Sequence, residues 1–501
     1  MNYLFYDDKL EYPDVNNNFS PSIRYPEYPF DDCISVSPND VYDSIRNMFY
    51  DMKLDRDNYG TNKWNPLGKW IKPGMNVCLK PNFVMHKNGS ENPNDLDSLV
   101  THPSIIRCLL DYCYIALKGK GKLVVGDAPV KDCDFEKLMN RRNYVDIVNF
   151  YKRNTNLNFD FYDFRGPEEE GGQYKSFGRG VKVNLGDKSW FYNCGHKESK
   201  LRIPNYDYKK VMSHHCGNVQ EYLINSTVLD ADVIISIPKP KTHRKNGYTA
   251  ALKNFVGINY SKEFLPHHTE GSIFNGGDEY ITNSYLSWFS SKLRLIIDKN
   301  RINIDKAGKH NLIAIRKILV KCQSIMWRIY SKSMNIDIQS SKKKYNDQAY
   351  HTREGSWYGN DTLWRTVLDL NYVLKYAKRD GSLSSQVQRV VLNFGDMVVS
   401  GEKEGPMAPS YKKQNMLLFS DNVVDFDCIV TKIMGFDYSK FIGLKNAVNF
   451  KPLMEHKYDE IVIKSNYNEC NGHLKDIEFS SVTTPFVPSE GWIGHVESVY
   501  S

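Results

Sequence analysis

The chain has 501 residues, of which 41% are hydrophobic and 25% are charged, and its formal net charge is +7. This composition is typical of a globular protein long enough for more than one hydrophobic core. A charge of +7 over this length is too weak for a bulk nucleic-acid binder, but it suits a protein that binds an acidic small molecule. No run of 18 apolar residues occurs, and the first residues lack the basic and apolar segments of a signal peptide. We therefore expect a cytoplasmic protein whose partner is a small anionic metabolite, with neither nucleic acid nor a membrane as a partner.

Ten cysteines are scattered along the chain, and none forms a C-x-x-C pair. An iron–sulfur cluster or a structural zinc site built on that spacing is therefore not expected. Dispersed cysteines in a long chain without a signal peptide predict reduced thiols.

The first half of the chain alternates predicted strands and helices. Residues 1–60 indicate an N-terminal arm followed by a helix over 38–51, capped by Ser37 or Asn39. Residues 61–260 form the first part of an α/β core. A strand near 76–80, a helix over 104–117 capped by Thr101 and a strand over 122–125 predict a right-handed parallel crossover. Short alternating segments over about 140–225 predict an antiparallel addition to this core.

The second half begins with a basic helical insertion over 261–350, with helices expected at 292–298 and 312–330. Residues 351–450 form the second part of the α/β core, with a helix after 360–362, strands at 389–394 and 416–420, and a helix over 422–434. A glycine-bounded acidic loop is expected at 401–406, and residues 451–501 form a C-terminal tail. The predicted fold is α/β, with mostly parallel sheets, flanking helices, two lobes, a helical insertion and an extended tail.

The stretch over 228–259 is central to this prediction. Its β-branched run over 233–237 suits a strand buried on both faces, and Pro238 and Pro240 end that strand. A basic loop follows at the strand's carboxyl end, which is where open α/β sheets bind ligands. Lys239 and Lys241 are therefore candidate anion ligands, although a basic loop is also typical of a solvated surface.

Polar residues also follow the other predicted strands. The candidate substrate-binding residues are Lys80, Asn82, Lys239, Lys241, Thr242 and Asn254. Asp127 and Asp396 each follow a strand and a glycine, so with His268 they are candidate ligands of a divalent metal ion. A turn-forming role suits these two aspartates equally well.

His243, His102 and Lys253 are the candidate catalytic residues. A neutral imidazole serves as a general base or a metal ligand near pH 7, and His102 stands at a helix N-terminus that favours the neutral ring. Lys253 is a candidate anion ligand or, with a lowered pKa, a nucleophilic amine. The structural alternatives are a histidine bonded to backbone, a histidine in a helix cap and a lysine on a helix surface.

The order of these segments resembles the DUF362 family of uncharacterised proteins. The resemblance spans roughly 75 to 445. It rests on KPN at 80–82, THP at 101–103, GDAP at 126–129, DADVIISIPKPKTH and TAALKNFVGI near 230–258, and on EGSWYGNDTLWR, GDMVVSGEKEGP and VDFDCIVTKIMGFD further on. Some members carry a ferredoxin-type cluster domain, but no matching cysteines occur here.

A weaker resemblance is to the catalytic domain of nickel-pincer lactate racemase-like proteins. In that family a lysine follows a Pro-His pair by ten residues, and here Lys253 follows His243 by ten. Ala251 and Leu252 stand where that family has two glycines, and this puts side-chain bulk where a flat cofactor would lie. The resemblance therefore implies a shared ancestry of the site and not the cofactor.

Together these features predict an enzyme that acts on a small carboxylate- or phosphate-bearing metabolite by His/Lys acid–base chemistry, of a racemase or epimerase type. The alternative is a non-catalytic protein that binds an anion or a nucleotide, for which lysines and backbone amides suffice.

Overall fold

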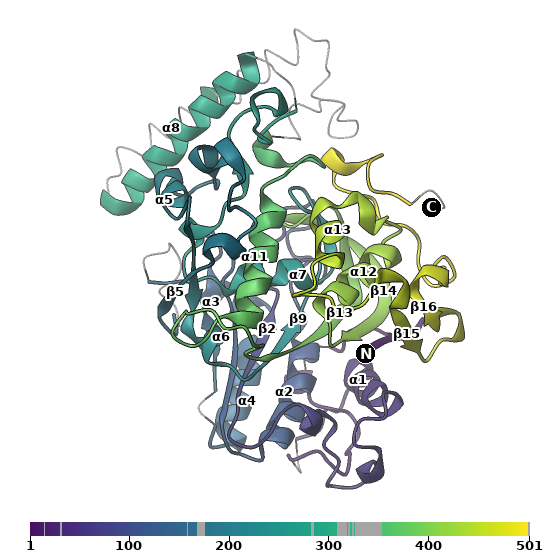
Figure 1. Ribbon diagram of the computed structural model, residues 1–501. Helices are drawn as coiled ribbons and strands as arrows, with labels where there is room; N and C mark the ends of the chain where they lie inside the picture. Colours follow the sequence, from purple (N-terminus) through teal and green to yellow (C-terminus); the bar gives the residue numbers. More distant parts are fainter. Residues whose placement is uncertain are drawn as a thin grey trace.

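The computed structural model describes residues 1–14, 16–30, 33–157, 159–167, 176–281, 285–307 and 353–498, together with positions 318, 321, 322 and 325. Its centre is a mixed sheet of eleven strands, with helices on both faces (Figure 1). The fold is therefore α/β, as the alternation of strands and helices predicts.

The main sheet consists of β1 (Asn2–Tyr6), β2 (Asn76–Pro81), β3 (Lys122–Asp127), β4 (Phe161–Asp163), β9 (Val233–Ile237), β10 (Lys241–His243), β11 (Gly247–Thr249), β13 (Val390–Glu404), β14 (Ala408–Ser420), β15 (Val462–Ser465) and β16 (Gly472–His473). Two small sheets consist of β5 (Gly180–Asn184), β7 (His215–Cys216) and β8 (Val219–Asn225), and of β6 (Leu201–Arg202) and β12 (His268–Thr269). The described α-helices are α1 (Asp40–Asp51), α2 (Pro103–Leu117), α3 (Phe135–Arg141), α4 (Tyr144–Asn154), α5 (Tyr208–Ser213), α6 (Ser226–Asp230), α7 (Ala251–Asn254), α8 (Tyr285–Ala307), α11 (Leu363–Tyr376), α12 (Val423–Ile433) and α13 (Ile442–Val448).

Five neighbouring strands, β4, β3, β2, β9 and β13, run parallel to one another. Ile235 of β9 pairs with Leu79 on one side and with Leu392 on the other. The two predicted α/β parts, 61–260 and 351–450, therefore contribute strands to one sheet. Beyond β13 the order continues through β14, β1, β15 and β16.

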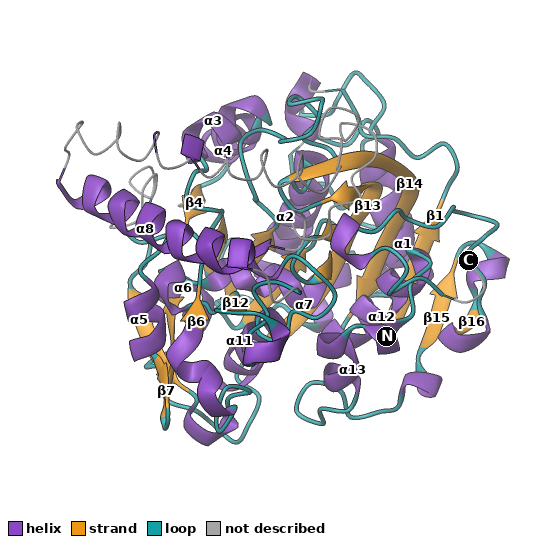
Figure 2. Ribbon diagram, turned by 90° about the horizontal axis from the view of Figure 1, so that it is seen from above, coloured by secondary structure: helices purple, strands orange, loops and turns teal. Residues whose placement is uncertain are grey.

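Alternate residues of the strands face two different layers. Leu79 packs in a hydrophobic cluster with α1, α2 and α4, whereas its neighbour Cys78 packs in another cluster with α11. Seen from above, the strands lie between these two helical layers (Figure 2). Both faces are covered, which explains why β9 is apolar along its whole length apart from Ser236.

Several segments differ from the sequence-based expectation. The N-terminal arm contributes β1, which lies inside the sheet between β14 and β15. Helix α4 and strand β4 lie in the stretch assigned to the antiparallel addition, yet β4 extends the parallel sheet. The β5–β8 pair, by contrast, is antiparallel as expected. The prediction of an acidic loop at 401–406 was wrong, because β13 continues to Glu404 and pairs there with β14. An exposed antiparallel strand tolerates such glycines and charges.

The predicted helix boundaries are largely confirmed. Asn39 caps α1 through its side chain, and Asn422 caps α12. The expected cap of α2 was wrong, because His102 rather than Thr101 accepts the N–H of Ser104. Helix α8 contains the helix expected at 292–298, and the helix expected at 312–330 lies outside the described residues apart from four single positions. No helix among the described residues is both long and apolar enough to cross a membrane.

Candidate active site

The carboxyl ends of β2, β3 and β9 meet at one edge of the sheet, beside the middle of β13. The loop after β9 lies along β13, because the N–H groups of Asp396 and Gly401 donate to the carbonyls of Pro238 and Pro240. These two backbone hydrogen bonds hold the loop against β13, so the side chains of Lys239 and Lys241 point into the protein. Lys239 and Lys241 are both 0% exposed, which excludes the alternative of a solvated basic loop.

Lys80 forms one buried ion pair at this edge. Its Nζ lies 2.7 Å from Oδ1 of Asp127 and donates to the carbonyl of Pro81 at 2.8 Å. Burial lowers the pKa of Lys80, and Asp127 opposes that shift. A Cβ on Gly257 would lie 1.8 Å from the Asp127 carboxylate, so only glycine permits this close approach of backbone to ion pair.

Lys239 forms a second buried ion pair, in which its Nζ lies 3.2 Å from Oδ2 of Asp396. The hydroxyl of Tyr12, from the N-terminal arm, accepts a hydrogen bond from Lys239 at 2.6 Å and donates to Asp396 at 2.5 Å. The backbone N–H of His102 donates to the same carboxylate at 2.7 Å. The arm thus completes the site, a role that its sequence does not indicate.

Amide side chains link Lys241 to the first ion pair. Lys241 donates to Oδ1 of Asn82 at 2.7 Å and to the carbonyl of Leu99 at 2.5 Å. Asn82 in turn donates to Asn254, which also accepts from Lys80. Burial and the neighbouring Lys239 place the pKa of Lys241 well below the usual range for a lysine. The predicted substrate-binding residues therefore converge, and we call the set Lys80, Asn82, Asp127, Lys239, Lys241, Asn254 and Asp396 the paired network.

Thr242 lies beside the paired network but donates to the carbonyl of Lys403, so its hydroxyl bonds to the β13–β14 hairpin. His102 also lies at the edge of the network. Its Nδ1 accepts the N–H of Ser104 at 3.2 Å, and its ring stacks on Tyr12 with the centroids 3.9 Å apart. The ring of His102 therefore acts as a helix cap.

Lys253 differs from the lysines of the paired network. It is partly buried, and no hydrogen bond or ion pair joins its side chain to any of the described residues. Burial lowers its pKa to about 7, and Lys262, Lys245 and Lys80 add to that shift. At neutral pH about half of its side chains are therefore free amines.

Two imidazoles accompany Lys253 with opposite hydrogen-bonding patterns. Nδ1 of His243 accepts the N–H groups of Lys245 and Asn246 at 3.0 and 3.1 Å, which leaves the ring hydrogen on Nε2. Nδ1 of His267 donates to the carbonyl of Leu265 at 2.8 Å, which leaves a lone pair on its Nε2. We call Lys253, His243, His267 and Lys245 the lysine–histidine cluster.

Burial and the charge of Lys253 lower the pKa of both imidazoles, to about 3 for His267 and well below 6.5 for His243. Burial likewise lowers the pKa of His102 well below 6.5. These histidines therefore do not titrate near pH 7, although the sequence led us to expect it. In this cluster the group with a pKa of about 7 is Lys253. His267, Lys245 and Tyr12 were missed as site residues. The pair of histidines at 267–268 was the available signal for His267, and the basic loop was the available signal for Lys245.

The three candidate metal ligands do not come together. Asp127 and Asp396 belong to different ion pairs, and His268 lies on β12 opposite Arg202. Among the residues that the structure describes, no group of three or more His, Cys, Asp or Glu side chains is arranged to hold a metal ion.

Residues 191–432 match the family model described as a domain of unknown function (DUF362). The protein contains a DUF362 domain. The matched segment includes the whole lysine–histidine cluster and Asp396, whereas Lys80, Asn82, His102 and Asp127 lie before it. A comparison with curated proteins found no match.

Proposed function

We propose that this DUF362 protein is an enzyme that moves a proton on a small anionic substrate, with the lysine–histidine cluster as its reactive centre. The observation that carries the proposal is Lys253, a partly buried amine with a pKa of about 7 and no bonded partner among the described residues. The three lysines of the paired network all have side-chain partners, because Lys80 and Lys239 meet carboxylates and Lys241 donates to Asn82 and to the carbonyl of Leu99.

The hydrogen bonds around the two imidazoles support distinct chemical roles. Near neutral pH both imidazoles are uncharged, so His267 can accept a hydrogen bond on Nε2 and His243 can donate one from Nε2, and both would orient the substrate. Lys253, whose pKa is about 7, is the candidate group that takes and returns the proton in a racemase- or epimerase-type reaction. His267 rather than His102 is the favoured partner of His243, because the Nδ1 of His102 caps α2.

The cations around the cluster support an anionic substrate. A bound carboxylate or phosphate would favour the charged form of Lys253 and raise its pKa, and it would lie near Lys245. The paired network would then act as a rigid floor whose charges are largely balanced. All ten cysteines are free, which supports a reducing compartment such as the cytoplasm for this chemistry.

A thermal-shift screen of carboxylate- and phosphate-bearing metabolites would supply a substrate, and turnover of variants on that substrate tests the proposal. Lys253→Met should lower kcat by about 10²–10⁴-fold, the usual contribution of a positioned acid–base group, and His243→Ala should also lower kcat because it removes a donor that orients the substrate. Lys182→Met, at an exposed lysine paired with Glu221, is the control and should keep full activity. A metabolite that binds without turnover, or full turnover in Lys253→Met, would favour a non-catalytic anion-binding protein.

A further inference from the structure

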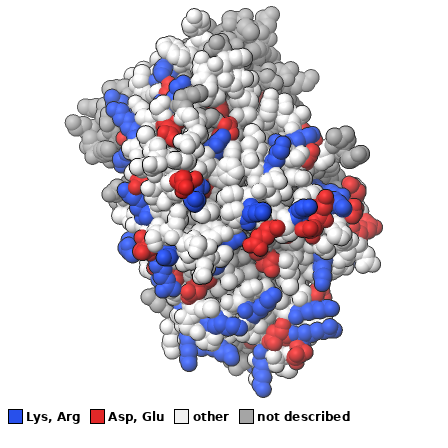
Figure 3. All heavy atoms as spheres, in the orientation of Figure 1, with Lys and Arg blue, Asp and Glu red and all other residues white. Residues whose placement is uncertain are grey.

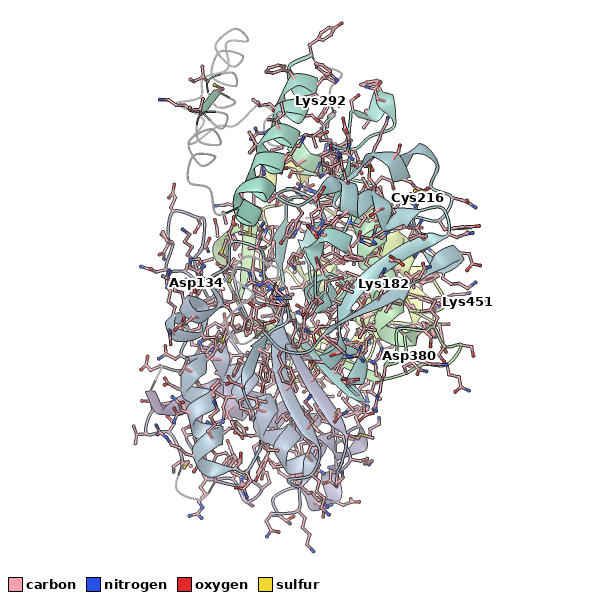
Figure 4. The ribbon with its side chains drawn as sticks, turned by 90° about the vertical axis from the view of Figure 1, so that its left-hand side faces the viewer. Asp134, Lys182, Cys216, Lys292, Asp380 and Lys451 are labelled. Carbon is pink, nitrogen blue, oxygen red and sulfur yellow. The ribbon has the colours of Figure 1, made fainter. Side chains whose placement is uncertain are left out.

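A polar hollow lies beneath α8, and the Nζ of Lys245, a member of the lysine–histidine cluster, donates to the backbone carbonyl of Glu354 in its wall. Helix α8, marked by Lys292, runs along the upper edge of the molecule (Figure 4). The hollow is lined by Arg244, Glu279, Tyr280, Ser287, Ser290, Ser291, Arg294, Arg353, Glu354 and Ser356.

Hydrogen-bond donors dominate this lining. Three guanidinium groups, four serine hydroxyls and one phenol account for eight of the ten lining residues. Burial raises the pKa of Glu279, one of the two carboxyls, to about 7, so that near neutral pH it is protonated for part of the time. Burial would also raise the pKa of Glu354, but Arg294 and Lys245 lower it below the usual range, and their nitrogens lie 3.4 and 3.8 Å from its carboxylate. The lining therefore carries more donors than acceptors, although Ser291 already donates to Glu279 and the guanidinium groups of Arg244 and Arg294 pair with Glu404 and Glu354.

A smaller hollow adjoins the first and shares Glu279, Ser291, Arg294 and Glu354 with it. Its lining includes His268, which is 5% exposed and whose Nδ1 has no hydrogen-bond partner among the described residues. The Nε of Arg202, in the same lining, also lacks one. Buried polar atoms are ordinarily paired, so these two nitrogens independently indicate that the walls face a polar ligand.

We propose that this hollow binds a phosphate group of the substrate, next to Lys245, which bonds both to Glu354 of the hollow and to His243 of the reactive cluster. The proposal rests on the proposed function and specifies its substrate class as a phosphorylated metabolite. A phosphate presents three terminal oxygens in three directions and suits several guanidinium and hydroxyl donors, whereas a carboxylate presents two oxygens in one plane. Arg244 lines the hollow and directly precedes Lys245 in the chain, which links the two regions.

Calorimetric titration of the full chain with inorganic pyrophosphate tests this proposal. The unmodified protein should bind the ligand saturably, and Arg244→Gln and Arg353→Gln should each weaken binding about tenfold, which is the loss of one charge-assisted contact. Arg379→Gln is the matched control, because Arg379–Asp232 is an exposed ion pair at 3.1 Å, as Arg244–Glu404 is. This control should bind like the unmodified protein.

Lys253→Met separates the hollow from the reactive cluster. It should retain pyrophosphate binding even if it has lost turnover. Failure of the unmodified protein to bind pyrophosphate would overturn the phosphate site. The phosphate site would also be overturned if pyrophosphate binding were lost in Lys253→Met but unchanged in both arginine variants, since the anion would then occupy the lysine–histidine cluster. Full turnover in Lys253→Met would overturn the proposed function and leave the phosphate site standing.

Discussion

The paired network and the lysine–histidine cluster use the same side chain in opposite ways. Lys80 and Lys239 each meet an aspartate within 3.2 Å, whereas Lys253, at the same edge of the sheet, meets no carboxylate among the described residues. On the face shown in Figure 3, positive and negative side chains lie side by side at several places, and Lys and Arg predominate at the lower end. Lys241 stands between the two cases, because it meets no carboxylate but donates to two neutral acceptors, Asn82 and the carbonyl of Leu99.

The difference follows from the cost of burying a charge. An ammonium loses its hydration on burial, and a carboxylate within hydrogen-bonding distance offsets much of that loss. Without the carboxylate, the balance shifts toward the neutral amine and the pKa falls. Three measurements would break or sharpen this comparison.

The largest expected effect is on amine reactivity. At pH 7 about half of Lys253 is free amine if its pKa is about 7, against roughly one part in 2,500 for an ordinary lysine with a pKa near 10.4. Trace labelling with acetic anhydride, read by peptide mass spectrometry, should modify Lys253 about a hundredfold or more faster than the exposed Lys182 (Figure 4). Its rate should rise through pH 7 as the ammonium loses its proton. A midpoint near pH 10 would show that Lys253 is an ordinary lysine.

The next effect is on stability. Asp396→Ala leaves Lys239 and the Tyr12 hydroxyl without their buried partner, and removal of one member of a buried ion pair commonly costs about 3–5 kcal/mol. The free energy of unfolding in urea should fall by that amount, whereas Asp380→Ala, at an exposed turn, should leave it unchanged. A loss below about 1 kcal/mol for Asp396→Ala would mean that the paired network is not a stabilising floor.

The smallest effect concerns His102. His102→Ala removes the cap of α2, worth about 1 kcal/mol in urea unfolding, together with the ring that stacks on Tyr12, and His102→Asn should restore the part due to the cap. If the ring only caps the helix, His102→Asn should also keep full turnover. A hundredfold loss of turnover in a stable His102→Asn protein would return His102 to the catalytic residues.

Local sequence features predicted many elements correctly because their causes are local. The β-branched run over 233–237 and the prolines behind it define β9, and Asn39 and Asn422 cap helices through their own side chains. The convergence of Lys80 and Lys241 was also predictable, because parallel strands end at a common edge.

Long-range pairing was not predictable in this way. Nothing around Asp396 indicates that it will meet Lys239 or that Tyr12 will bond to both, since these contacts join segments far apart in the chain. The strand identity of β1 and the extension of β13 to Glu404 also depend on partners elsewhere in the sheet.

Short stretches of this sequence thus determine the order of strands and helices and place several lysines at one edge of the sheet. Which lysine receives a carboxylate, which histidine keeps its lone pair and which is used as a cap were decided only when distant segments packed together. The physical reason is that burial and the nearest charge set a side chain's protonation, and both are properties of the folded surroundings.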